Sequence, residues 1–148
     1  MPNHFHFVLI PNEEACNNII LGDKLTHLQN LSKAIGKTLS SYTKAINIQN
    51  KTSGNLFQKK TQAKCLSDLR TLDYVLSCFY YIHQNPLKAN LVNELREWIY
   101  SSYPDYYGLR NGTLCNKKLA MEILSLSDAD LKRDFMKKLD EKIIERIF

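Results

Sequence analysis

One segment of this chain has the residue pattern of a β-strand, and it lies at the start of the sequence. Side chains over residues 4–10 alternate between two faces, with Phe5, Phe7 and Leu9 on one of them. A proline and an asparagine follow and are typical of the turn that ends a strand. Few later segments have this pattern, so we expect a sheet of few strands accompanied by helices.

The composition indicates one folded domain of ordinary size. The 148 residues are 44% hydrophobic and 24% charged, which excludes a disordered tail. The net charge of +5 and the pI near 9.0 permit a polyanionic partner. No apolar run is long enough to span a bilayer, and no charged leader precedes the first one, so we expect no signal peptide. The four cysteines form no CxxC pair, which argues against a zinc finger and for reduced thiols in the cytosol.

Three later segments have helical periodicity. Apolar residues recur at spacings of three and four over residues 28–46, with Thr26 as a candidate N-cap. A second helix is expected over residues 69–85 and should end at Pro86, because proline disfavours the α conformation of the residue before it. A third should begin at Ser127 with a capping-box pattern.

The remaining segments are expected to be less regular. Residues 12–25 are polar and mixed, and predict a loop. Residues 56–64 predict a second strand with basic flanks, and residues 108–116 a flexible join to the C-terminal part.

His4 and His6 are the first candidate for chemistry. Residues i and i+2 of a strand face the same side, about 7 Å apart, so both imidazoles can reach one ion. Two surface histidines beside a polar loop are the alternative, and for an isolated pair of this kind that alternative is favoured.

Tyr81 and Asn85 are the second candidate. Their i, i+4 spacing places them on one face of a helix, where a tyrosine nucleophile would lie one turn from a metal ligand. The alternative is an amphipathic tyrosine that packs its ring and exposes its hydroxyl to water, and on spacing alone this alternative is favoured.

Basic residues after a glycine turn are the third candidate. The segment that follows Gly54 could lie along a phosphate backbone, or could be an ordinary edge strand protected by lysines. The candidate DNA contacts, including two from the first helix, are Lys33, Lys37, Gln58, Lys59, Lys60 and Lys64.

Together these segments resemble the HUH single-tyrosine transposases, in particular the REP-associated branch. The resemblance spans residues 1–108 in the right order. It is carried by the histidine pair with its hydrophobic neighbours, Gly54-Asn55-Leu56-Phe57-Gln58, Tyr81-Ile82-His83-Gln84-Asn85-Pro86-Leu87-Lys88-Ala89, and Trp98-Ile99-Tyr100-Ser101-Ser102-Tyr103. Asn90 stands where that pattern often has glycine.

The resemblance implies a fold and a reaction. The fold would be α+β, a ferredoxin-like antiparallel sheet with packed helices, with a catalytic domain over residues 1–108 and a helical extension over residues 109–148. His4, His6 and Asn85 would hold Mg²⁺ or Mn²⁺. Tyr81 would attack single-stranded hairpin DNA, giving a 5′-phosphotyrosine link and a free 3′-hydroxyl before strand transfer.

The resemblance also implies that a strand and a helix precede the histidine strand, so we expect an N-terminally truncated domain of low stability and weak nuclease activity. We further expect a cytoplasmic, nucleoid-associated protein without a membrane partner, and a homodimer is left open. The main alternative is a transposase-derived DNA-binding remnant without catalysis. A basic α/β domain with a structural tyrosine cluster is the third option.

Overall fold

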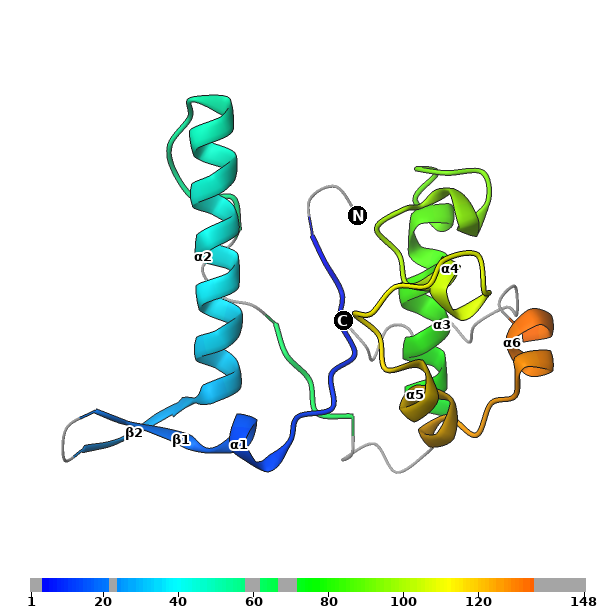
Figure 1. The fold of residues 1–148 in the computed structure, drawn as a ribbon, viewed down its shortest axis with the longest axis horizontal. Coiled ribbons are helices and arrows are strands. Elements are labelled where there is room, and N and C mark those ends of the chain that lie inside the picture. The colour runs from blue at the N-terminus through cyan, green and yellow to red at the C-terminus, as the bar shows by residue number, and fades with distance from the viewer. Residues whose placement is uncertain (1–3, 22–23, 58–61, 67–71, 135–148) are drawn as a thin grey trace. The chain divides into compact units, whose positions relative to one another are not determined.

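The computed structural model describes residues 4–21, 24–57, 62–66 and 72–134, and it confirms a mixed α+β fold. The elements in order are α1 (Glu13–Cys16), β1 (Asn18–Leu21), β2 (Lys24–Gln29), α2 (Asn30–Asn50), α3 (Leu72–Lys88), the 3₁₀ turn η1 (Leu95–Glu97), α4 (Tyr103–Tyr106), α5 (Lys117–Ile123) and α6 (Asp128–Asp134) (Figure 1). Among these residues the sheet consists of the antiparallel pair β1–β2. None of the helices described is long and apolar enough to cross a membrane.

Two compact units make up the chain: Leu9–Gln62, and Met1–Val8 together with Ala63–Phe148. The second unit contains the main core, in which α3 contributes Phe79 and Tyr80. Leu124 and Leu131, from the part of the chain expected to be an extension, are buried in that same core, as are Leu95, Tyr103 and Tyr106. The described part of residues 109–148 therefore shares its core with α3.

The expected strand at residues 4–10 is wrong. Residues 4–12 have no regular secondary structure. A strand needs a neighbour to satisfy its backbone groups, and β1 and β2 are hydrogen-bonded to each other. The alternating side chains therefore do not define a sheet face, and Phe7 and Leu9 are 62% and 50% exposed.

The expected loop at residues 12–25 is also wrong, because it contains α1 and much of the β1–β2 hairpin. Asn12 caps α1 by accepting a hydrogen bond from the Ala15 N–H at 2.9 Å. Thr26 lies on β2 instead of capping a helix, and its hydroxyl donates to the Ile19 carbonyl across the hairpin at 2.7 Å. The cross-strand bond explains why this residue stays extended.

The first predicted helix is confirmed as α2, although residues 28–29 belong to β2. Residues 56–57 and 62–64 are not in a strand, and the rest of that expected strand lies outside the described residues. The segment after α2 folds back beside it: the Asn47 side-chain amide donates to the Gly54 carbonyl at 2.9 Å (Figure 1). This folded-back segment stands where the sequence predicted the start of a strand.

Pro86 does not end α3, which continues to Lys88. Proline removes only one intrahelical donor, and the Ala89 N–H still bonds to the Asn85 carbonyl at 2.9 Å. The helix ends before Asn90, whose φ is 54°, and the Leu91 N–H bonds back to the Pro86 carbonyl at 3.0 Å. This is a Schellman motif, and it places Asn85 inside the helix instead of at its end.

The predicted capping box at the start of α6 is confirmed. The Ser127 N–H donates to Asp130 Oδ2 at 3.0 Å, and the Asp130 N–H donates to Ser127 Oγ at 3.2 Å. Residues after 134 lie outside the described residues, so the further course of this helix is not tested.

Candidate functional site

Four residues singled out from the sequence come together in the second unit. The extended segment at residues 4–8 brings His6 to α3, where the Asn85 Nδ2 donates to the His6 Nε2 at 3.2 Å. The His6 ring lies 5.9 Å from the Tyr81 ring and 4.9 Å from the His4 ring, measured between centroids. The i, i+2 and i, i+4 spacings therefore meet at one place, even though the histidines are not on a strand.

The hydrogen bond from Asn85 fixes the state of His6. Its Nε2 accepts, so this nitrogen carries no proton and the ring is neutral. Burial lowers the pKa of His6 below its usual value, and the neighbouring His4 lowers it further. A neutral imidazole is the form that binds a metal ion.

Tyr81 differs from its neighbour Tyr80 in a way that matters for chemistry. Tyr80 is 1% exposed within the core, whereas Tyr81 is half-buried beside the histidines. Burial raises the pKa of the Tyr81 phenol, so the hydroxyl stays protonated at neutral pH. A nucleophilic role would require its proton to be removed during attack.

Lys88 is a neighbour of this site that the sequence patterns did not single out. Its Nζ lies 5.9 Å from the centroid of the Tyr81 ring. The i, i+7 spacing from Tyr81, two helical turns, is the signal that would have found it. A cation at this distance attracts the ring face and supplies positive charge near the phenol.

The residues present are of types that bind a divalent ion: two imidazoles and a side-chain amide. The His6 Nε2 and the Asn85 amide face each other at 3.2 Å. A half-turn of the Asn85 amide exchanges Nδ2 for Oδ1, the atom that binds cations. No group of three His, Cys, Asp or Glu side chains forms a metal cluster within the described ranges, and the expected set contains only two such residues.

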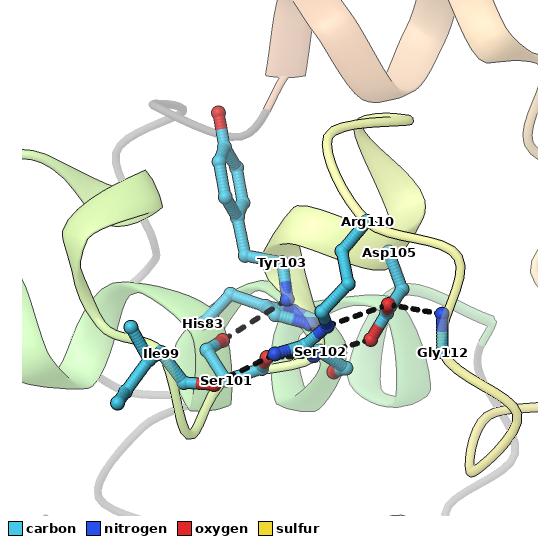
Figure 2. A network of polar contacts seen from close by, with 8 residues as sticks. All are labelled: His83, Ile99, Ser101, Ser102, Tyr103, Asp105, Arg110 and Gly112. Atoms are coloured by element: carbon cyan, nitrogen blue, oxygen red, sulfur yellow. Dashed lines mark hydrogen bonds and ion pairs between the residues drawn. The ribbon is translucent and has the colours of Figure 1, made fainter.

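A second polar network, shown in Figure 2, fixes the segment after η1 to α3. His83 is 2% exposed; its Nδ1 contacts the Phe79 carbonyl and its Nε2 contacts Ser102 Oγ, both at 2.7 Å. A carbonyl only accepts, so Nδ1 carries the proton and the Ser102 hydroxyl donates to Nε2. Sequence reasoning noted these residues only as parts of motifs; their role here is to hold two segments together.

Arg110 closes this network at the surface. Its guanidinium pairs with the Asp105 carboxylate through two nitrogens and donates to the Ile99 and Ser101 carbonyls at 2.7 and 2.8 Å (Figure 2). The Arg110 hydrogen bond lowers the pKa of Asp105. The network is structural, and His83 connects it to α3, the helix that also carries Tyr81 and Asn85.

The expected DNA contacts are spread over the chain. Lys33 and Lys37 are exposed on α2, in the first unit, and Lys64 is exposed in the second unit. Gln58, Lys59 and Lys60 lie outside the described residues. The structure therefore brings the expected catalytic and metal-binding residues together, whereas the described basic residues belong to two different units.

Comparisons with protein-family models, with curated proteins and with solved structures find no match to this chain. The family resemblance remains a prediction from the motifs.

Proposed function

We propose that this chain is a metal-dependent DNA-nicking and strand-transfer protein of the HUH single-tyrosine type, acting on single-stranded hairpin DNA. The single observation that supports it is the meeting of His4, His6, Tyr81 and Asn85 at one half-buried place. Residues 79 positions apart in sequence have no local reason to touch, and the contact joins the two halves of the proposed site.

Each residue has a distinct role in the proposed reaction. Tyr81 Oη loses its proton and attacks the scissile phosphorus, which forms the 5′-phosphotyrosine bond. The bond from phosphorus to the 3′ oxygen breaks, and that oxygen takes up a proton to become the free 3′-hydroxyl. His4, His6 and Asn85 would hold Mg²⁺ or Mn²⁺, which when bound polarises the phosphate. Lys88, whose Nζ lies 5.9 Å from the centroid of the Tyr81 ring, would offset negative charge on the phenol oxygen as its proton leaves. Reversal of the attack by a different 3′-hydroxyl completes strand transfer.

The finer fold and partner assignments belong to the same proposal. A ferredoxin-like catalytic domain, a nucleoid location and a homodimer would each accompany this activity. The alternative is a DNA-binding remnant that keeps these residues without catalysis. Residues 4–12 have no regular secondary structure, and this favours the alternative, because a metal site requires firmly held ligands.

Covalent capture tests the proposal. The full chain is incubated with Mn²⁺ and a pool of hairpin oligonucleotides with randomised single-stranded flanks, and adducts are resolved under denaturing conditions. We expect an adduct that requires the metal and disappears in Tyr81→Phe. Tyr80→Phe is the matched control, because it removes a neighbouring hydroxyl that lies in the core. Adducts lost in Tyr80→Phe and kept in Tyr81→Phe would refute the assignment, and DNA binding without any adduct would establish the remnant.

A further inference from the structure

The positive charge of this protein is concentrated in one stretch of sequence. Residues 24–67 contain eight lysines and no acidic residue, whereas all 15 Asp and Glu lie outside it with the other 12 Lys and Arg. The stretch contains α2 and the segment that returns beside it. Repulsion among like charges without compensating acids indicates a surface adapted to an anionic partner.

The lysines of α2 share one face. Lys33, Lys37 and Lys44 are four and seven residues apart, close to one and two helical turns, so they lie within about 40° around the axis. Lys51 follows directly after the helix at the same spacing of seven. All four side chains are exposed, and the stripe is about 27 Å long at 1.5 Å per residue.

A groove adjoins this stripe, between α2 and the returning segment. It has a volume of about 710 Å³ and is lined by Leu39, Thr43, Lys44 and Asn47 on the helix and by residues 52–57 opposite them. Lys44 belongs to both the stripe and the groove. Asn47 anchors the returning segment, since its Nδ2 donates to the Gly54 carbonyl and its Oδ1 accepts from the Thr52 hydroxyl at 3.0 Å.

One residue that lines the groove, Phe57, belongs to an aromatic pair. The centroid of its ring is 6.0 Å from that of Tyr42, which is 55% exposed. A basic stripe beside a groove with an accessible aromatic ring is the arrangement by which proteins bind unpaired nucleotides: lysines contact phosphates and rings stack on bases. A duplex has no unstacked base to offer such a ring.

We propose that the groove between α2 and residues 52–57 binds a single-stranded nucleic acid, with phosphates along Lys33, Lys37, Lys44 and Lys51 and a base against Phe57. The surface lies in the first unit, whereas the His4–Tyr81 group lies in the second. The inference shares its class of partner with the proposed function but depends on different residues, so each can fail alone.

Salt-dependent binding of a hairpin-free strand tests the inference. The full chain is titrated against a fluorescent 20-nucleotide oligothymidylate in EDTA, from 50 to 200 mM salt, by anisotropy. Each lost phosphate contact should reduce the log–log salt slope by about 0.7. Lys37→Gln/Lys44→Gln should therefore reduce it by about 1.4 and weaken binding at least about tenfold at low salt. The control variant Lys117→Gln/Lys118→Gln, on α5, removes the same charge and should change neither the salt slope nor the affinity.

Phe57→Leu supplies the second arm, because it keeps apolar packing and removes the stacking surface. Binding should weaken by about 5- to 150-fold, with the salt slope unchanged. Equal loss in both lysine pairs would show attraction by net charge alone and overturn the inference. Equal competition by a duplex of the same length, or tighter binding to vesicles with one-third phosphatidylserine, would also overturn it. If the chain binds oligothymidylate but forms no hairpin adduct, the groove is supported and the proposed nicking activity is refuted. If it forms adducts but does not bind oligothymidylate, the nicking activity is supported and the groove is refuted.

Discussion

The imidazole of His83 accepts a hydrogen bond from the Ser102 hydroxyl at 2.7 Å while its other nitrogen donates to the Phe79 carbonyl. This pair joins α3 to the segment that leads into α4. The bond therefore helps to hold α3, the helix that bears Tyr81 and Asn85, in position. The His83 ring is buried and Ser102 is half-buried, so loss of the bond should be measurable in the stability of the second unit.

Ser102→Ala should lower the free energy of unfolding by about 1 kcal/mol, because a buried imidazole nitrogen loses a donor. Denaturant unfolding measures the change. Ser102→Thr keeps the hydroxyl and should lie closer to wild type. If the alanine and threonine variants were equally stable, the hydroxyl would have no stabilising role.

His83 should make stability depend on pH in a defined window. Burial lowers its pKa from 6.5 to about 4, against the smaller opposing effect of the Phe79 carbonyl. Between these values the unfolded chain binds more protons than the folded one, so stability is full above pH 6.5 and falls as pH drops to 4. The loss should total about 3 kcal/mol. Unfolding is measured across this range in a His6→Gln background, since the pKa of His6 is lowered too; a flat profile would contradict the assignment.

Two glycines should respond to alanine in opposite directions. A Cβ on Gly112 would lie 2.7 Å from Asp105 Oδ1, which accepts from the Gly112 N–H at 2.9 Å and is held by Arg110. Gly112→Ala should cost about 1 kcal/mol through that displaced carboxylate. Gly36 lies inside α2 with nothing within 4 Å of its Cβ position, so Gly36→Ala should stabilise by about 0.5–1 kcal/mol. Thermal unfolding of both variants gives the signs.

The left-handed positions that follow three helices should favour glycine. Lys51, Asn90 and Ser125 have φ of 53°, 54° and 52°, conformations that L-residues adopt at a cost. Lys51→Gly should stabilise by about 1 kcal/mol and Asn90→Gly by less, because asparagine tolerates this region. Denaturant unfolding measures both stability changes. If the two variants gained equal stability, or if Asn90→Gly gained more, the left-handed helix ends at Lys51 and Asn90 would be contradicted.

Asn85→Asp separates a ligand from a hydrogen-bond donor. As a ligand, residue 85 would act through oxygen, which aspartate retains, so Mn²⁺ binding measured by calorimetry should persist. If Asn85 acts only as a hydrogen-bond donor to His6 Nε2, aspartate could not replace it, because a carboxylate does not donate. Asn85→Leu is the control and should abolish metal binding; unchanged Mn²⁺ affinity in that variant would exclude Asn85 from the site.

The sequence by itself determined the two longest helices, the start of α6 and four members of the candidate site, whereas α1, α4, α5 and the neighbouring Lys88 were not predicted. Apolar spacing predicted α2 and most of α3, and the Ser127–Asp130 pattern predicted the start of α6, because these signals act within a few turns of one chain. The spacings of His4, His6, Tyr81 and Asn85 likewise identified residues that meet in space.

Only the tertiary structure decided where extended segments pair and where helices end. Alternation at residues 4–10 indicated a strand, yet a strand exists only with a partner, and pairing is not encoded locally. Pro86 stayed helical because backbone bonds beyond it complete a Schellman motif at Asn90. The His83–Ser102 bond joins residues 19 positions apart, and the packing of α3 against the segment leading into α4 created it.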